Sequence, residues 1–463
     1  MQGITPTLAT HHLSQYCEDD ICSNLLAPLE VGNIVLSHRA VAAPLTRCRA
    51  LNYAPQEAHQ EYYGQRATKG GLLITEAVAI SQEGIGFPHS PGIWTEEQVQ
   101  QWRHVVRAVH DKGGYIFCQL WHVGRASHTY YQPHGDAEGL LNGPVSSTAR
   151  KVPESRQIRL PDGVMAEYSQ PRALDMHEIP KVVEQFQHGA RNAMRAGFDG
   201  VEIHGAHGYL IDQFLKDGIN NREDEYGGSV ENRCRFALEV MSAVVSEIGG
   251  PKTAMRISPI IDHLGAYDSD PIPLGLHLIS HLNNMDLAYL HITEPRMTNQ
   301  GLKPITTNAG DEERSLQLFQ KAYKGRVMLS GGYTRETGME AIRSGAADMI
   351  SYGRLFIANP DLPLRFAIRA ELNEGDRSTY YTHDQVKGYL DYAMLTPSQV
   401  AQRWADMKAD MGKKKMVEWN YLITSQQSSR HVWLESPAES NTGTPQSKSM
   451  FLQKPTLSSK KTP

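Results

Sequence analysis

The chain has 463 residues, of which 40% are hydrophobic and 21% are charged, and its formal net charge at pH 7 is −5. This balance is typical of a globular protein, and the length suits one large domain or a few small ones. The negative net charge disfavours a nucleic-acid or anionic-membrane partner, and the sequence contains no run of roughly 20 apolar residues that could span a membrane.

The first twenty residues show neither the basic and apolar regions of a secretory signal nor the basic composition of a transit peptide. The last residues, KTP, differ from a peroxisomal signal of the S-K-L type. We therefore expect a cytoplasmic protein in which residues 1–23 form an N-terminal extension. A reducing compartment also fits the cysteines, which are odd in number and scattered: Cys17, Cys22, Cys48, Cys118 and Cys234.

Eight short runs rich in β-branched and aliphatic residues recur along the chain, and most are followed by a loop and an amphipathic stretch. Continuous apolar runs of this kind suit parallel strands that are buried on both faces. The runs are RAVAAP (39–44), LLITEA (72–77), YIFCQL (115–120), DGVEIH (199–204), TAMRIS (253–258), LAYLHI (287–292), RVMLSG (326–331) and DMISYG (348–353).

Helical patterns lie between these runs. In residues 96–114 the apolar side chains fall on one helical face, and Gly113 and Gly114 end the pattern. Similar patterns precede the fourth and fifth runs, link the seventh and eighth, and recur at 398–411. Eight strands that alternate with helices favour a (β/α)₈ TIM barrel, with an open doubly wound sheet as the alternative.

The longest gap between runs separates the third from the fourth. There the stretch IRLPDGVMAEY (158–168) predicts a β-hairpin that turns at Pro161–Gly163. An insertion after the third strand is expected over the C-terminal mouth of a barrel, as a lid or wall. From about residue 424 the chain is rich in Ser, Thr, Pro, Gln and Lys. We therefore expect a barrel domain at 24–411 and a disordered tail at 412–463.

Functional residues of a barrel stand where its strands end. The seventh run leads into SGG and the eighth into SYGR, so Gly332, Gly353 and Arg354 offer backbone and guanidinium donors to a phosphate. Two tight turns and a surface arginine are the alternative. Gln119 ends the third run, and its amide matches the edge of a pyrimidine-like ring. Arg256, inside an apolar run, needs either a carboxylate partner or an anionic ligand.

The hexapeptide HGAHGY (204–209) ends the fourth run. His204 and His207 could chelate zinc, but no HExxH frame is present and no third ligand is evident. A structural role is a second interpretation. In the third, both imidazoles donate to one carbonyl oxygen while Tyr209 supplies a proton. Gly205 and Gly208 would then keep side chains away from the ligand and let the chain bend.

A phosphate site, a pyrimidine-edge amide, a buried arginine and a histidine pair together suggest flavin mononucleotide (FMN). No G-x-G-x-x-G motif follows a strand, so a nicotinamide cofactor would visit the same pocket in turn. Two other functional classes stay open at this point. One is a metal-dependent barrel hydrolase that uses the two histidines, and the other is a non-catalytic binding or scaffold barrel.

Five longer motifs resemble the old yellow enzyme family of flavin-dependent ene-reductases, and plant 12-oxophytodienoate reductases in particular. The resemblance covers residues 24–397. The motifs are APLTRCRA (43–50), CQLWHVGRASH (118–128), AGFDGVEIHGAHGYLIDQFLKDGIN (196–220), EYGGSVENRCRF (225–236) and SYGRLFIANPDL (351–362).

This resemblance implies a TIM barrel with bound FMN that NADPH reduces before an α,β-unsaturated carbonyl takes its place. His204 and His207 would hold the carbonyl, flavin N5 would give hydride to the β carbon, and Tyr209 would protonate the α carbon. The flavin ring would contact Pro44, Leu45, Thr46, Ala77, Gln119 and Arg256, the phosphate would contact Gly332, Gly353 and Arg354, and the substrate would contact Phe87, His263, Arg296 and Tyr381.

The resemblance also implies a small-molecule enone or oxylipin substrate and a monomer or weak dimer. Thr46 stands where some bacterial relatives carry cysteine, which favours the plant and yeast type. Phe87 and His263 resemble the pocket pair of the jasmonate-forming branch, yet the chain ends without that branch's usual peroxisomal tripeptide. We therefore expect reduction of 12-oxophytodienoate-like cyclopentenones, with general enone detoxification as the alternative.

Overall fold

The computed structural model describes residues 24–133, 143–295, 297–298, 301–302 and 310–410. The chain divides into two compact units, residues 1–409 and 410–463, and the account below concerns the first. The expected N-terminal extension (1–23) and tail (412–463) lie outside the described residues.

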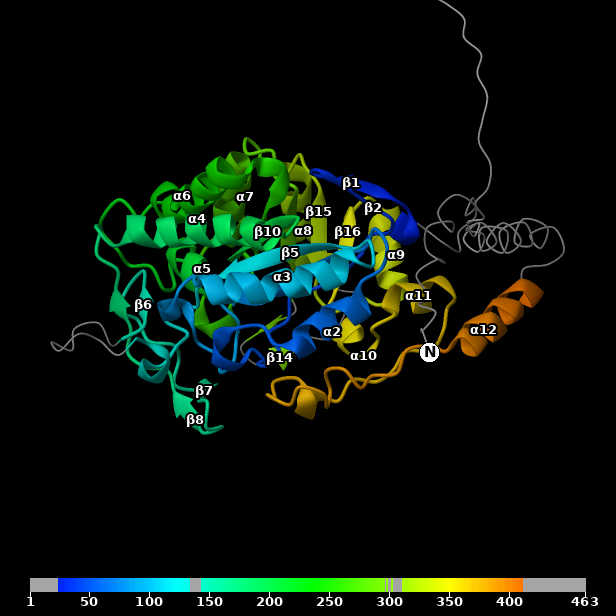
Figure 1. Cartoon of the computed structure of the whole chain (residues 1–463). Helices are drawn as coiled ribbons and strands as arrows, with labels where there is room; N and C mark the ends of the chain where they lie inside the picture. The colour runs from blue at the N-terminus through cyan, green and yellow to red at the C-terminus, as the bar shows by residue number, and fades with distance from the viewer. Residues whose placement is uncertain (1–23, 134–142, 296, 299–300, 303–309, 411–463) are drawn as a thin grey trace, which may run out of the picture. The chain divides into compact units, whose positions relative to one another are not determined.

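Eight parallel strands close into a barrel, with β16 paired to β3 (Figure 1). Each strand falls on one of the eight predicted apolar runs, so the TIM-barrel prediction is confirmed and the open sheet is wrong. Around the barrel the strands are β10 (Gly200–Gly205), β11 (Thr253–Ile257), β12 (Tyr289–Thr293), β15 (Val327–Ser330), β16 (Met349–Tyr352), β3 (Ala40–Ala42), β4 (Leu72–Ala79) and β5 (Tyr115–Trp121).

Helices alternate with these strands and cover the barrel. Helix α3 (Glu96–His110) shows how the sequence forms them. Thr95 and Gln98 make a capping box at its start, and Trp102 is the largest side chain on its buried face. The others are α2 (Glu57–Arg66), α4 (Ile179–Ala196), α5 (Leu210–Leu215), α6 (Val230–Ile248), α7 (Pro271–Leu282), α8 (Gly310–Ala322), α9 (Arg335–Arg343), α10 (Arg354–Ala358), α11 (Leu362–Ala367) and α12 (Pro397–Asp410).

The insertion between β5 and β10 contains the predicted hairpin. Strands β7 (Gln157–Arg159) and β8 (Met165–Glu167) pair antiparallel, and the amide of Leu160 donates to the carbonyl of Val164 over 2.8 Å. Ile158 of this hairpin is buried in one apolar cluster with Trp121, the last residue of β5. The hairpin therefore packs at the C-terminal end of the barrel. Strands β6 (Val145–Ser146) and β9 (Arg172–Ala173) pair beside it.

The opposite end of the barrel is closed by the hairpin of β1 (Leu29–Val31) and β2 (Ile34–Leu36). Its buried Val31 and Leu36 belong to the same apolar cluster as Phe117 and Tyr289 inside the barrel. A functional site at the C-terminal end is thus backed by a packed interior. The short strands β13 (Met297–Thr298) and β14 (Gly301–Leu302) pair antiparallel after β12.

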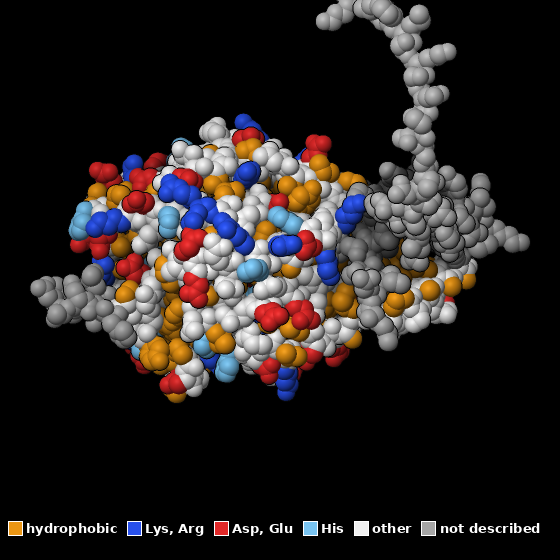
Figure 2. All heavy atoms as spheres, in the orientation of Figure 1, with side chains coloured by type: hydrophobic (Ala, Val, Ile, Leu, Met, Phe, Trp, Pro, Cys, Tyr) orange, Lys and Arg blue, Asp and Glu red, His pale blue; other side chains and the backbone are white. Residues whose placement is uncertain are grey.

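In the part of the chain that the structure describes, no helix has the length and apolar character needed to cross a membrane. On the face shown in Figure 2, Lys and Arg side chains are interspersed with Asp and Glu side chains.

Candidate active site at the barrel mouth

Strand register brings the predicted site residues to one end of the barrel. His204 lies opposite Arg256 in the β10–β11 pair, and Ala77 lies opposite Gln119 in the β4–β5 pair. The carboxyl ends of neighbouring parallel strands meet at one rim, which is where barrel enzymes place their active sites.

The three ring side chains of the hexapeptide lie close together. The ring centroid of His204 lies 5.4 Å from that of His207 and 5.1 Å from that of Tyr209, and both contacts are edge-on. His207 reaches this position because its backbone is left-handed, with φ at 57°. Its amide donates to the hydroxyl of Ser258 over 2.8 Å. Two imidazoles and one phenol therefore converge from a single strand end.

The two glycines of the hexapeptide allow a bend of the chain and close contacts within the protein. A Cβ on Gly208 would lie 2.5 Å from the carbonyl oxygen of His263, and φ at this residue is +74°. A Cβ on Gly205 would lie 2.6 Å from Cε of Met255 on the neighbouring strand. These glycines thus permit close approach of protein segments and a left-handed turn, and they do not simply clear space for a ligand.

A buried ion pair holds the turn at Gly208 in place. Nζ of Lys216 lies 3.1 Å from Oδ2 of Asp212, and both side chains are almost fully buried. Asp212 accepts the amide of Gly208 over 2.8 Å, while Lys216 donates to the carbonyls of Ser258 and Ala266. This pair therefore ties the hexapeptide to the loop after β11 that carries His263.

Both histidines are uncharged at ordinary pH. Burial, followed by the cation of Arg256, lowers the pKa of His204 to about 3. The same two causes, in that order, hold the pKa of His207 well below its usual value. A buried guanidinium beside both rings disfavours a metal dication at this position. Among the described residues, no cluster of three or more metal-ligating side chains occurs.

Tyr209 is held in its protonated form. Burial, followed by the nearby phenols of Tyr168 and Tyr381, raises the pKa of Tyr209 above its usual value of about 10. Its ring stands edge-on to Trp121, with 4.9 Å between centroids. The phenol can therefore donate a proton, and it is surrounded by groups that give it a fixed orientation.

Hydrogen bonds inside the barrel hold the side chains of Arg256 and Gln119. Nε and Nη2 of Arg256 donate to the hydroxyls of Thr293 and Ser330 over 3.3 and 3.2 Å, so these hydrogen bonds go to neutral groups. Nε2 of Gln119 donates to Oε1 of Glu202 over 2.7 Å. The guanidinium charge is therefore available to an anionic ligand, and the amide of Gln119 is held in a defined orientation.

Glu202 is a functional candidate that the sequence analysis missed. Its side chain is fully buried in the barrel, where Oε2 lies 2.9 Å from Nδ1 of His291. Nε2 of His291 in turn lies 3.0 Å from the hydroxyl of Ser351. The signal was present: Glu202 is a charged residue inside an apolar run, as Arg256 is.

The two predicted phosphate loops are neighbours. Ser330 and Ser351, which precede them, lie opposite each other in the β15–β16 pair. Gly332 has a left-handed backbone with φ at 86°. A Cβ on Gly353 would touch the side chain of Leu45 at 3.4 Å, so this loop meets the segment after β3 that holds Pro44 and Thr46. Arg354 begins α10 and is exposed.

Three of the four predicted substrate-side residues lie near the same mouth. Phe87 packs on Trp121 with ring centroids 5.8 Å apart, and the His263 carbonyl lies against Gly208. Tyr381 is 54% exposed and lies on the C-terminal segment beyond η7 (Arg377–Thr379). Arg296 lies outside the described residues.

The residues present at this mouth fit FMN. The buried Nε2 of His207 and the indole Nε1 of Trp121 have no hydrogen-bond partner among the described residues, so both atoms can bond polar atoms of a ligand. Arg256 supplies a positive charge, and paired glycine loops supply backbone donors at the adjacent rim. Arg256 could thus bind the flavin ring, and the glycine loops could bind the phosphate.

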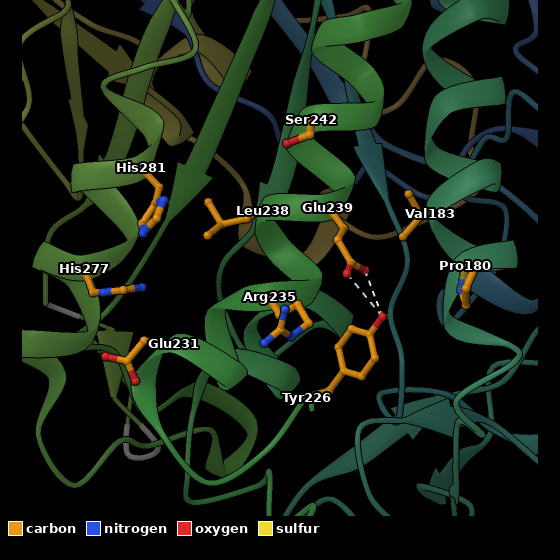
Figure 3. Close-up of a pocket in the computed structure, with 10 residues that line it drawn as sticks. All are labelled: Pro180, Val183, Tyr226, Glu231, Arg235, Leu238, Glu239, Ser242, His277 and His281. Carbon is orange, nitrogen blue, oxygen red and sulfur yellow. Dashed lines mark hydrogen bonds between the residues drawn. The ribbon is translucent and has the colours of Figure 1, made fainter. Parts of the chain in front are cut away.

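A separate groove of about 720 Å³ lies on the outer helices and is shown in Figure 3. Its lining residues come mainly from α4, α6 and α7, and the Tyr226 hydroxyl is bonded to Glu239 over 3.0 Å. Because no barrel-strand end contributes to it, this groove is not part of the site at the mouth.

Comparisons with known proteins show which family the chain belongs to. Residues 24–373 match the family described as the NADH:flavin oxidoreductase / NADH oxidase family. The chain is 54% identical over 378 residues to 12-oxophytodienoate reductase 7 of Oryza sativa subsp. japonica, a match that covers 80% of this chain and 94% of the relative. Identity to 12-oxophytodienoate reductase 1 of the same plant is 49%, over 80% of this chain and 93% of the relative.

Solved structures lead to the same assignment. Morphinone reductase in complex with tetrahydroNAD matches with a TM-score of 0.74 and 40% identity, over 81% of this chain and 99% of that one. The old yellow enzyme homologue from Zymomonas mobilis matches with a TM-score of 0.72 and 40% identity, over 81% of this chain and 100% of that one. The chain therefore belongs to the old yellow enzyme family of FMN-dependent NAD(P)H oxidoreductases.

Proposed function

We propose that this protein is an NADPH-dependent ene-reductase that reduces the C=C bond of α,β-unsaturated carbonyls, with cyclopentenones like 12-oxophytodienoate as its substrates. The convergence of His204, His207 and Tyr209 carries the proposal, because it joins two neutral imidazoles to a protonated phenol around one space. The similarity to plant 12-oxophytodienoate reductases supports the substrate class.

His204 and His207 bind the carbonyl oxygen of the enone in this proposal. Each neutral imidazole has one N–H to donate, and donors that are already in place stabilise the negative charge that develops on oxygen when the β carbon accepts hydride. Tyr209 then gives its proton to the α carbon. Because its pKa is raised, the phenol keeps that proton until a strongly basic carbon is present.

FMN, when bound, supplies the hydride for the β carbon. Arg256 and Gln119, with Ala77 and the segment Pro44–Thr46, would hold its ring, and the loops of Gly332 and Gly353 with Arg354 would hold its phosphate. Glu202 orients Gln119 from inside the barrel. NADPH would enter the same mouth and leave before the enone binds. The complex of morphinone reductase with tetrahydroNAD supports a nicotinamide partner.

We assign this activity to a catalytic domain at residues 24–411. The family match to 24–373 and the compact unit that ends at Ala409 support these bounds. General enone detoxification is the second candidate role, since the same residues would reduce small enones that lack a long side chain.

An absorption spectrum of the purified protein tests the proposal first. We expect flavin bands, and NADPH oxidation that enones accelerate, with 12-oxophytodienoate giving a higher kcat/KM than 2-cyclohexen-1-one. A protein that lacks flavin and cannot be reconstituted with FMN would overturn the assignment. Equal kcat/KM for both enones would favour detoxification, and NADH in place of NADPH in parallel assays decides the donor.

A further inference from the structure

The C-terminal segment 376–391, which we name the strap, is ordered without a sheet or an α-helix. Apart from η7 it has no regular secondary structure, so its backbone carbonyls lack the partners that a ladder would supply. In Figure 1 this segment runs past α2 and α10. Local turns bond some of these groups, and other parts of the chain bond several of the carbonyls.

Two buried arginines, Arg47 and Arg49, supply those partners. Arg47 donates to the carbonyls of Tyr380 and Gly388 over 3.1 and 2.7 Å. Arg49 donates to the carbonyls of Thr379, Asp384 and Lys387 over 3.0, 2.6 and 3.1 Å. Their relative exposures are 1% and 0%. One planar guanidinium thus holds several turns of the strap at once, which a lysine ammonium cannot do with the same geometry.

The backbone between the arginines is shaped for this task. Cys48 has φ at 58°, which is a left-handed conformation. Side chains of an extended chain alternate between its two faces, and this turn lets the side chains of both Arg47 and Arg49 reach the strap. The strap contacts this loop in return, since Nε2 of Gln385 donates to the Arg49 carbonyl over 3.0 Å. Tyr389 of the strap stacks on Tyr62 with ring centroids 4.1 Å apart.

The same loop borders the proposed cofactor site. Arg47 follows Thr46 directly, and its amide donates to Oε2 of Glu76, the neighbour of Ala77, over 3.2 Å. On the other side, His383 of the strap packs against His89 with centroids 5.7 Å apart. His89 lies two residues from Phe87, which packs on Trp121 at the mouth. The strap is therefore connected to both the cofactor side and the substrate side.

We propose that Arg47 and Arg49 are positioning residues that hold the strap at the barrel mouth, and that the position of the strap determines which enones the site accepts. The inference rests on the proposed ene-reductase function. Neither arginine reaches the reacting atoms: both act through the strap, which carries Tyr381. Their loss is expected to change enone binding and leave reduction by NADPH almost unaltered.

Arg49→Lys tests the proposal in the full-length holoenzyme, because it keeps the positive charge and removes the fork of donors. We expect faster trypsin cleavage after Lys387, and a KM for 12-oxophytodienoate raised about tenfold while the rate of NADPH-driven flavin reduction changes less than twofold. The KM for 2-cyclohexen-1-one should rise less. Arg107→Lys, at an exposed position on α3, is the matched control and should change none of these values.

Gln385→Ala provides a second variant that leaves both buried charges in place, should Arg49→Lys fail to fold. A released strap with unchanged KM values overturns the proposed role in specificity, and a strap that stays protected from trypsin in both variants overturns the clamp itself. If the wild-type protein reduces no enone, the proposed function fails, and the trypsin comparison still decides whether the arginines hold the strap.

Discussion

His204 and Arg256 face each other at the same register position of β10 and β11, so a buried imidazole and a buried guanidinium are direct neighbours. Burial is the main reason that the pKa of His204 is low, and the neighbouring cation of Arg256 lowers it further, because a second positive charge there would be unfavourable. The pair thus places a fixed cation and a neutral hydrogen-bond donor side by side at the mouth of the barrel.

Enone reduction should show no histidine ionisation near neutral pH. Because the pKa of His204 is lowered to about 3 and that of His207 lies well below its usual value, both rings stay neutral throughout the assay range. We expect kcat/KM for the enone to lack an inflection between about pH 5 and 8. An inflection near pH 6.5 that disappears in His204→Asn would contradict this prediction.

Acid should destabilise the fold below the usual histidine pKa. Burial lowers the pKa of His122 to about 3, whereas the unfolded chain has a value of about 6.5. The stability that follows from this lowering is fully present above about pH 6.5 and is lost as pH falls toward 3, by up to about 1.4 kcal/mol per pH unit for one such histidine. Urea unfolding of His122→Gln should show a weaker dependence on pH over this interval, and an unchanged slope would count against the assignment.

Tyr209→Phe should separate the two half-reactions. Removal of the hydroxyl takes away the proton donor, so we expect enone reduction to slow by ~10²–10⁴-fold, whereas flavin reduction by NADPH continues at its normal rate. Stopped-flow absorbance resolves both steps. Wild-type rates of enone reduction in the variant would show that the proton comes from another group.

Substitution of either histidine should weaken ligands that carry a phenolate oxygen. Such an oxygen mimics the developing charge on the enone carbonyl, and a hydrogen bond to a charged group is worth about 1.5–3 kcal/mol. We expect His207→Ala to lower the affinity for a simple phenol by roughly ten- to a hundredfold in flavin-monitored titrations. His207→Asn, which restores an N–H donor, serves as the matched comparison and should recover part of the loss.

Gly208→Ala should destabilise the protein more than an ordinary glycine substitution. The new methyl group would meet the His263 carbonyl, and the left-handed φ adds strain. Gly228→Ala is the control, because φ there is +79° and a Cβ would have no atom within 4 Å. In urea unfolding we expect a loss greater than about 1 kcal/mol for Gly208→Ala and a smaller loss for the control. Equal losses would show that the close contact is relieved.

The barrel could be predicted from sequence because each strand is a local signal. Runs such as residues 115–120 are continuous, apolar and bounded by helix patterns, so their assignment does not depend on distant partners. The same logic predicted that the loops after Ser330 and Ser351 would be neighbours, since strand ends in a barrel share one rim.

Features that depend on distant pairing were not predictable in this way. Glu202 contacts His291, which lies 89 residues later in the chain, and the two side chains meet only in the folded barrel. The strap has no periodic pattern that a sequence analysis could detect. Its carbonyls bond Arg47 and Arg49, which lie more than 300 residues earlier in the chain. Likewise, the sequence shows that Asp212 and Lys216 are four residues apart, but it does not show that their ion pair is buried.

The pairing of β16 with β3 has a consequence for the order of assembly. These neighbours are the last and the first strands of the barrel, with Ile350 opposite Ala40, so the ring stays open during synthesis until almost all of the folded domain has left the ribosome. The residues that we propose for FMN lie on both sides of this seam, in the segment Pro44–Thr46 and the loop of Gly353. Cofactor binding is therefore expected to be a late step in folding, and the strap should dock after it. Partly synthesised chains should bind no flavin.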